Sequence, residues 1–464
     1  MRFASAITTA AFATGLGAVL VACGDDSGSA EGLFGSAESE GGSGSSPSGG
    51  GAESNEGSGG SGSAADGADD SSDEGPKFDT PDGVSAGDDG GPGDCECGNS
   101  EWSYVFIANS QESTVAKINT RTLVEEGRYL TRADGNGNPS RTSVSIDGKA
   151  VAVANRHVGL LKIWARPELC AESNGMAGIQ TSTGKDDVLP FGQDECVAWF
   201  TDFPDMTVER PVQWTPGEGE CHQNQKIWTV TGTNGQSPGF CGPGGVWVHR
   251  VDGDTGVVED TIHLDEGQFP CTVAILPNGT GVGVGIYGGA VDADGNFYTH
   301  GFDNGKFARV DFDTLNVEYF SGGGYGITVD TKGRAWWNGV SRFDYSTGMY
   351  QSAGVSGGSG GIAQDLQNRM WFANNTKGVT WVDMDSMALG DTIDLPEGPG
   401  WTVKGVSVDI DGFIWAVRQD ETVAYKIDPD DYSIEMYDGL NGPYTYSDMT
   451  GGALANVTCN PPEG

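Results

Sequence analysis

A short pattern that recurs along residues 101–458 limits this chain to few folds. In each copy, a turn rich in Asp and Gly leads into an apolar or aromatic run, as at residues 292–298 (DADGNFY) and 409–415 (DIDGFIW). Self-similarity at a period of about 35 to 60 residues, with turn residues at fixed offsets, is typical of a β-propeller. The second strand of each repeat falls at 104–109, 150–155, 227–231, 297–300, 335–338, 370–374 and 413–418, which predicts seven blades.

The two ends of the repeat region complement each other. Residues 450–454 (TGGAL) are similar to the inner strands expected at 287–291 (YGGAV) and 325–329 (YGITV), whereas no inner strand precedes 104–109. We therefore expect an all-β, seven-bladed propeller in which the N- and C-terminal strands share one blade, because shared closure removes exposed sheet edges.

The first residues predict export. Arg2 gives a positive start, an apolar stretch follows, and residues 20–23 (LVAC) resemble a bacterial lipobox. The resemblance implies a lipoprotein signal peptide over 1–22, cleavage before Cys23 and a lipid on its sulfur. The alternative is an ordinary secretory signal with a chance cysteine.

Residues 23–94 are mostly Gly, Ser, Asp and Glu, with Lys77 as the only basic residue. Such a segment buries too little apolar surface to offset its ordering entropy, so it is predicted to be a flexible tether. The propeller then spans 95–464. These features predict an extracytoplasmic, lipid-anchored protein of the bacterial cell envelope, at the outer membrane or cell surface.

The charge narrows the set of partners. The formal net charge is −41, from 25 basic and 66 acidic residues. So acidic a chain repels phosphate backbones, which excludes nucleic acid as an expected partner. The expected partners are the membrane, through the lipid anchor, and a small ligand, a glycan or a protein.

Eight cysteines remain besides Cys23, and an even number in an exported chain favours disulfides over a metal site. Each of two pairs brackets a long polar excursion between strands, so we predict Cys170 with Cys196 and Cys221 with Cys241. Closure of the ring predicts Cys459 with Cys95 or Cys97. The partner of Cys271 stays open.

The pattern of inner strand, D-x-x-G turn, aromatic strand and D-x-x-T-G hairpin resembles the virginiamycin B lyase (streptogramin lyase) group and its NHL and YVTN relatives. The likeness covers 101–458, apart from an inserted region around 168–222. It implies a seven-bladed propeller and, in the lyases, magnesium-supported elimination by histidines and a glutamate. Only His300 falls near the expected channel mouth, so no catalytic residue is transferred to this chain.

Loops before the inner strands and after the second strands share one face of a propeller. We expect an anionic or hydroxyl-rich ligand there, bound by amides, phenols and cations in loops. The alternative is that these residues only satisfy backbone groups. The candidates are Asn155, Arg156, Tyr287, His300, Tyr325, Asn338, Asn374, Lys404 and Arg418.

Two sets of recurring residues have structural explanations. The aromatics at similar offsets are expected to pack between blades rather than to stack on carbohydrate: Trp228, Tyr298, Trp336, Trp371 and Trp415. The repeated acids are expected to form turns, with a ring around a calcium ion as the alternative: Asp147, Asp292, Asp330, Asp365 and Asp409.

The sequence therefore predicts a non-enzymatic binding or interaction module on a surface tether. The alternative is a lyase-like enzyme that uses His300, acidic residues and a divalent cation, Ca²⁺ or Mg²⁺, at the central channel.

Overall fold

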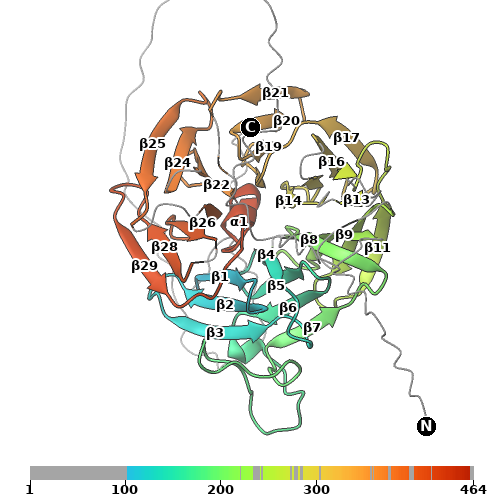
Figure 1. Cartoon of the computed structure of the whole chain (residues 1–464), viewed down its shortest axis with the longest axis vertical. Coiled ribbons are helices and arrows are strands. Elements are labelled where there is room, and N and C mark those ends of the chain that lie inside the picture. The colour runs from blue at the N-terminus through green and yellow to red at the C-terminus, as the bar shows by residue number, and fades with distance from the viewer. Residues whose placement is uncertain are drawn as a thin grey trace, which may run out of the picture. The chain divides into compact units, whose positions relative to one another are not determined.

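Seven β-sheets surround a central axis in the computed structural model (Figure 1). Six of these sheets have four antiparallel strands and one has three, so the predicted seven-bladed β-propeller is confirmed. The structure describes residues 102–459 except 220, 234–240, 242–243, 272–273, 276–280, 283–285, 302–304, 356–357, 359, 375–377, 397–401 and 420.

Each blade is a meander whose strands follow the chain order. The three-stranded blade contains β1 (Tyr104–Asn109), β2 (Thr114–Asn119) and β3 (Glu125–Leu130). The four-stranded blades are β4 (Pro139–Val144), β5 (Ala150–Asn155), β6 (Leu160–Trp164) and β7 (Val197–Thr201); β8 (Met206–Trp214), β9 (Lys226–Thr233), β10 (Val246–Asp252) and β11 (Val258–His263); β14 (Gly288–Val291), β15 (Phe297–His300), β16 (Lys306–Val310) and β17 (Val317–Ser321); β18 (Ile327–Val329), β19 (Arg334–Trp337), β20 (Ser341–Asp344) and β21 (Met349–Ser352); β22 (Ile362–Gln364), β23 (Arg369–Ala373), β24 (Gly378–Asp383) and β25 (Leu389–Asp394); and β26 (Val403–Val408), β27 (Ile414–Arg418), β28 (Val423–Ile427) and β29 (Ile434–Asp438).

Among the described residues, three small elements lie outside the blades. A 3-10 helix, η1 (Pro167–Leu169), opens the excursion between β6 and β7. A two-stranded ribbon, β12 (Ala274–Ile275) and β13 (Gly281–Val282), follows β11. One α-helix, α1 (Gly452–Cys459), lies near the centre of the ring (Figure 1).

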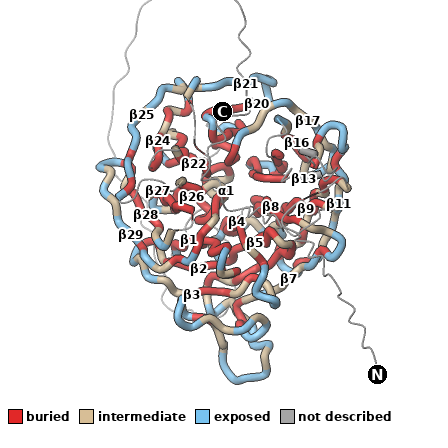
Figure 2. The backbone as a smooth tube through the Cα atoms, viewed as in Figure 1, coloured by how far each residue is buried: buried red, intermediate tan, exposed pale blue. Residues whose placement is uncertain are grey.

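The recurring tryptophans form the core, as predicted. Trp228, Trp336, Trp371 and Trp415 are all fully buried, and the buried residues lie inside the ring while the outer strands carry most of the exposed ones (Figure 2). The indole nitrogen of Trp336 donates a 2.7 Å hydrogen bond to the carboxylate of Asp330, six residues earlier.

The acids of the turns take the structural role that we expected. The same tryptophan-to-aspartate bond recurs between Trp371 and Asp365 at 2.7 Å and between Trp415 and Asp409 at 2.9 Å. In the turn before β15, the Asp292 carboxylate accepts from two backbone amides of residues 294 and 296. The carboxylates of Asp330, Asp365 and Asp409 thus tie their turns to the tryptophan of the strand that follows.

The C-terminus closes the ring, but through other residues than predicted. The amide of Phe106 donates to the carbonyl of Met449 at 2.8 Å, and the amide of Tyr444 donates to the carbonyl of Ala108 at 3.1 Å. Residues 443–449 therefore lie beside β1, and residues 452–459 form α1 instead of an inner strand.

A carboxylate just before α1 explains this difference. Asp448 accepts hydrogen bonds from the amides of Ala453 at 3.1 Å and Leu454 at 2.9 Å, which satisfies donors in the first turn of the helix. The run of Ala and Leu that follows has high helix propensity. The glycines before it match an inner strand only by their spacing.

One predicted disulfide is confirmed and one is wrong. Cys170 is bonded to Cys196. Cys241 is bonded to Cys271, with Cα atoms 5.9 Å apart, and not to Cys221. Cys221 precedes β9 and Cys241 follows it, so an extended strand of roughly 25 Å keeps those two apart.

The remaining N-terminal predictions are not tested by the described residues. Cys221 and Cys459 are also disulfide-bonded, but Cys95 and Cys97 lie outside the described residues, so the predicted pairing of Cys459 stays a prediction. The signal peptide, Cys23 and the tether lie outside them as well. Within the described ranges, no helix combines the length and apolarity that a membrane span requires.

Candidate functional site

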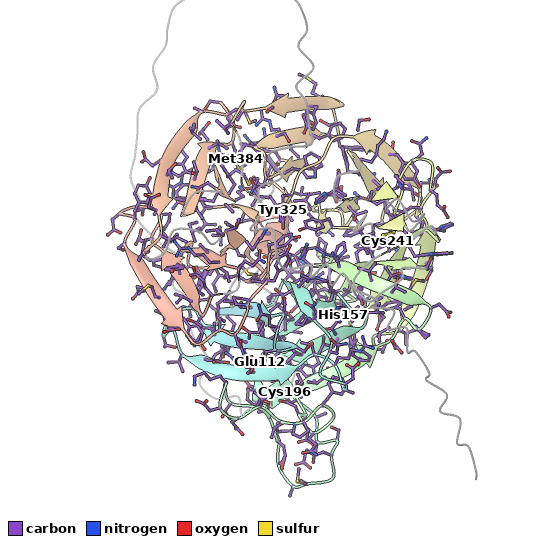
Figure 3. The ribbon with its side chains drawn as sticks, in the orientation of Figure 1. Glu112, His157, Cys196, Cys241, Tyr325 and Met384 are labelled. Atoms are coloured by element: carbon purple, nitrogen blue, oxygen red, sulfur yellow. A yellow bond between two sulfur atoms is a disulfide. The ribbon has the colours of Figure 1, made fainter. Side chains whose placement is uncertain are left out.

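Four tyrosines meet at the axis of the ring. Tyr287 precedes β14, Tyr325 precedes β18, and Tyr444 and Tyr446 come from the segment that closes the ring. The hydroxyl of Tyr444 lies 2.8 Å from that of Tyr287 and 2.8 Å from that of Tyr325. Figure 3 shows Tyr325 near the centre of the molecule.

Glycines beside two of these tyrosines let the inner strands approach closely. A Cβ on Gly288 would lie 2.5 Å from Nε2 of His300, and a Cβ on Gly326 would lie 2.6 Å from the carbonyl oxygen of Gly360. A larger residue at position 326 would therefore press on the backbone of the neighbouring blade, and one at position 288 would displace the side chain of His300. Each of these two tyrosines is thus followed by a glycine at a tightly packed position.

Four cations from three blades surround the tyrosines. They are Arg141 in β4, Arg156 after β5, Arg210 in β8 and Lys404 in β26. All four are at most 3% exposed. We call these four residues, together with Tyr287, Tyr325, Tyr444 and Tyr446, the axial cluster.

The cations lie over the aromatic rings. The Arg141 guanidinium is 3.3 Å from the ring centroid of Tyr446, and that of Arg210 is 4.7 Å from the centroid of Tyr287. The Arg156 guanidinium is 4.6 Å from the centroid of Tyr444. Such contacts are attractive because the faces of aromatic rings carry partial negative charge.

Lys404 contacts two of the rings and one hydroxyl. Its ammonium lies 4.5 Å from the ring centroid of Tyr325 and 5.6 Å from that of Tyr444. It also donates a 2.8 Å hydrogen bond to the Tyr325 hydroxyl. Because an ammonium cannot accept a hydrogen bond, the Tyr325 proton is available to the oxygen of Tyr444.

The four phenols differ in acidity. Burial raises the pKa of Tyr287, Tyr325 and Tyr446 above the ordinary value of 10.0. Burial also raises the pKa of Tyr444, but the charges of Lys404 and the three arginines outweigh it and lower that pKa to about 7. The axial cluster therefore combines one phenol whose pKa is lowered with three whose pKa values are raised.

His300 lies beside the axial cluster and is fully buried. Its ring centroid is 6.2 Å from that of Tyr287, with the rings edge to face. Burial lowers its pKa to about 4, so the imidazole is neutral at physiological pH. Of the sequence candidates, the structure thus brings Arg156, Tyr287, His300, Tyr325 and Lys404 together.

Three candidate asparagines serve the backbone instead. The Asn155 amide donates to the carbonyls of Thr131 and Gly159, at 2.8 and 2.9 Å. The Asn338 amide donates to carbonyls of the next blade, including that of Ala373 at 3.0 Å. The Asn374 side-chain oxygen accepts from the backbone amide of Gly378 at 3.2 Å, and its amide donates to the hydroxyl of Thr380 at 2.9 Å. This is the structural alternative that we considered for such residues.

We expected Arg418 and Lys404 in loops, but the structure places them elsewhere. Both belong to strands and are 1% exposed. Arg418 donates to the carbonyls of Leu395 and Pro396 at 3.3 and 3.2 Å, and it lies 3.5 Å from a carboxylate oxygen of Glu421. It therefore links the ends of neighbouring blades.

Four members of the axial cluster were absent from the sequence candidates. Arg141 and Arg210 lie in inner strands without the glycine that follows Tyr287, Tyr325 and Lys404, and the other two members, Tyr444 and Tyr446, lie beyond the last repeat. The alternation Tyr444-Thr445-Tyr446 in a segment that had to close the ring was the available signal. Within the described ranges, no group of three or more His, Cys, Asp or Glu side chains is arranged to hold a metal ion.

Comparisons with known proteins concern the fold. No family model and no curated protein matches the chain. Similar solved structures include a streptogramin B lyase (TM-score 0.42, 13% identity, 65% of this chain and 83% of that chain). They also include the virginiamycin B lyase of Staphylococcus aureus (TM-score 0.42, 14% identity, 67% and 89%) and BamB of Moraxella catarrhalis (TM-score 0.38, 11% identity, 74% and 87%).

Proposed function

We propose that this chain is a ligand-binding module, held at the bacterial cell surface by a lipid on Cys23, and that its axial cluster binds an anionic ligand. One observation carries the proposal: four buried cations converge on Tyr444 and its neighbours. In a chain of net charge −41, this cluster is a local centre of opposite charge. Such contrast concentrates anions at one place on a protein.

The chemistry of the axial cluster suits an oxyanion. Guanidinium groups present several donors in a plane that matches carboxylate, phosphate or sulfate. The protonated phenols of Tyr287 and Tyr325 add further donors, and their rings offer apolar faces to the rest of a ligand. The same cations lower the pKa of Tyr444 to about 7, so its phenol can lose its proton beside a bound anion.

The structure at the other end of the inner strands, away from Tyr287 and Tyr325, favours a small ligand or the end of a polymer. The inner strands and Ala453 and Leu454 of α1 line a common cavity. The helix is also fixed to the ring, since Asn456 donates to the carbonyl of Gln364 at 3.2 Å. Because α1 occupies this part of the axis, a polymer is not expected to thread through it.

A binding screen tests the proposal. Anionic metabolites and acidic glycans would be titrated calorimetrically into the intact protein, K404M and R210M, with K185M as the control. Lys185 is an exposed lysine paired with Asp186, outside the axial cluster. We expect tight binding to the intact protein and K185M, weaker binding to the other two, and lower affinity at higher salt. Equal affinity in all four proteins would place the site elsewhere.

A further inference from the structure

The axial cluster has the arrangement of a reactive site as well as a binding site. Tyr444 is half-buried, whereas Tyr287, Tyr325 and Tyr446 are buried. Its hydroxyl lies 2.8 Å from the hydroxyls of both Tyr287 and Tyr325. Lys404 donates to Tyr325, so the Tyr325 proton can point at Tyr444. Phenols that donate to a phenol oxygen stabilise its anion.

The surrounding cations select the kind of substrate. A phenolate and an anionic ester repel each other unless positive charge lies between or beside them. Arg141, Arg156, Arg210 and Lys404 all act on Tyr444 and lower its pKa to about 7. The same cations can neutralise the oxyanion of a substrate. A neutral substrate would make no use of them.

We propose that Tyr444 is a nucleophile and that the axial cluster accepts a phosphate or sulfate monoester, a tetrahedral oxyanion ester. This inference rests on the anion site proposed above and names its substrate class. The phenolate oxygen of Tyr444 attacks phosphorus or sulfur, a new Tyr444–O bond forms, and the bond to the ester oxygen breaks. The leaving alkoxide or phenoxide takes a proton from Tyr287 or Tyr325.

Water completes the reaction. It attacks the same phosphorus or sulfur, its proton restores the phenol that protonated the leaving group, and Tyr444 departs as the phenolate. The net reaction is hydrolysis of the ester to an alcohol or phenol and inorganic phosphate or sulfate. The cations stabilise the charge on the transferred group throughout, which is how such transfers are generally accelerated.

Two chromogenic esters provide the test. The intact protein, Y444F and Y345F would be incubated with p-nitrophenyl phosphate and with p-nitrophenyl sulfate. Tyr345 is the matched control. It is an exposed tyrosine whose ring centroid lies 4.1 Å from the Arg309 guanidinium, so it also has a cation beside its ring. Its hydrogen bond to Glu318 raises its pKa, unlike that of Tyr444. We expect release of p-nitrophenolate from at least one ester by the intact protein and Y345F, and loss of release in Y444F.

A second measurement keeps the test independent of how Y444F folds. The intact protein would be treated with an aryl sulfonyl fluoride, and the labelled tyrosine would be located by peptide mapping. We expect the label on Tyr444, with a rate that rises through pH 7. The ester from which p-nitrophenolate is released faster shows whether the site prefers a phosphate or a sulfate monoester.

Release that survives in Y444F, release from neither ester, or a label that spares Tyr444 would overturn the inference. Calorimetry with inorganic phosphate and sulfate separates the two proposals. Binding without turnover overturns the nucleophile and leaves the binding module standing, whereas absence of both overturns both for this class of anion.

Discussion

The ammonium of Lys404 donates a 2.8 Å hydrogen bond to the hydroxyl of Tyr325, 79 residues earlier in the chain. The two residues belong to blades that are separated by a third blade, which contains β22–β25. The bond therefore joins parts of the ring that share no sheet. Through Tyr325, the charge of Lys404 is connected to Tyr444, whose hydroxyl is a further 2.8 Å away.

Replacing Lys404 should make Tyr444 less acidic. In K404M, one of the charges that lower the pKa of Tyr444 to about 7 is lost. Titration followed by the ultraviolet absorbance of phenolate should show an ionisation near neutral pH in the intact protein and a shift to higher pH in K404M. The variants Y444F, which should lack this ionisation, and K185M, which should retain it, are the controls. An identical titration of K404M and the intact protein would contradict the prediction.

Arg418 should matter for stability and not for ligand binding. Its buried guanidinium bonds the carbonyls of Leu395 and Pro396 and lies near Glu421. Loss of such a buried ionic contact costs about 3 kcal/mol. In R418M we expect chemical denaturation to show that decrease in the free energy of unfolding, with the affinity for anions unchanged. Weaker anion binding by R418M without a loss of stability would contradict this prediction and show that Arg418 belongs to the binding site.

Glu209 should make the stability depend on pH. It is fully buried, and burial raises its pKa from the ordinary 4.5 to about 8. Its carboxyl lies 2.7 Å from the Thr229 hydroxyl, which also bonds the carbonyl of Pro211 at 2.9 Å. A protonated Glu209 can donate to Thr229 while Thr229 donates to Pro211, so every proton has an acceptor.

The sign of this dependence follows from the raised pKa. The stabilisation by protonated Glu209 is complete below about pH 4.5 and is lost as the pH rises through 8. The amide of Gln can donate in the same way without titrating. Between pH 5 and pH 8, the free energy of unfolding should therefore fall more in the intact protein than in E209Q, by on the order of 3 kcal/mol. If the free energy of unfolding changed with pH equally in the intact protein and in E209Q, the role of Glu209 would be refuted.

Cys459 should connect the end of the ring to its beginning. Peptide mapping without reduction should recover it with Cys95 or Cys97, which closes a loop of roughly 360 residues. The Cys170–Cys196 bridge has a sequence separation of only 26. Loop entropy predicts that C459S loses about 2 kcal/mol more stability than C170S. Recovery of Cys459 with any other cysteine would show the prediction to be wrong.

Cys23 should carry the membrane anchor. In cells that express the full chain, C23S should abolish metabolic labelling with fatty acid and move the protein out of the membrane fraction. A second variant, C170S, controls for the loss of a cysteine. A C23S protein that stays with the membrane would exclude the lipid anchor.

The sequence by itself determined the blades, because their signals are local. An acid such as Asp330 binds the backbone of its own turn and the indole of Trp336, all within six residues. The phase of the repeat also placed Tyr287, Tyr325 and Lys404 at one end of the inner strands. Interactions of such short range can be inferred from spacing alone.

The tertiary structure decided the rest. Asp448 caps α1, so residues 452–459 form a helix, although the spacing within residues 450–454 suggested an inner strand. The acidity of Tyr444 depends on Arg141, Arg156, Arg210 and Lys404, which come from three different blades. Electrostatic interactions act through space and depend on which side chains reach the axis. Only closure of the ring brings those charges to one phenol.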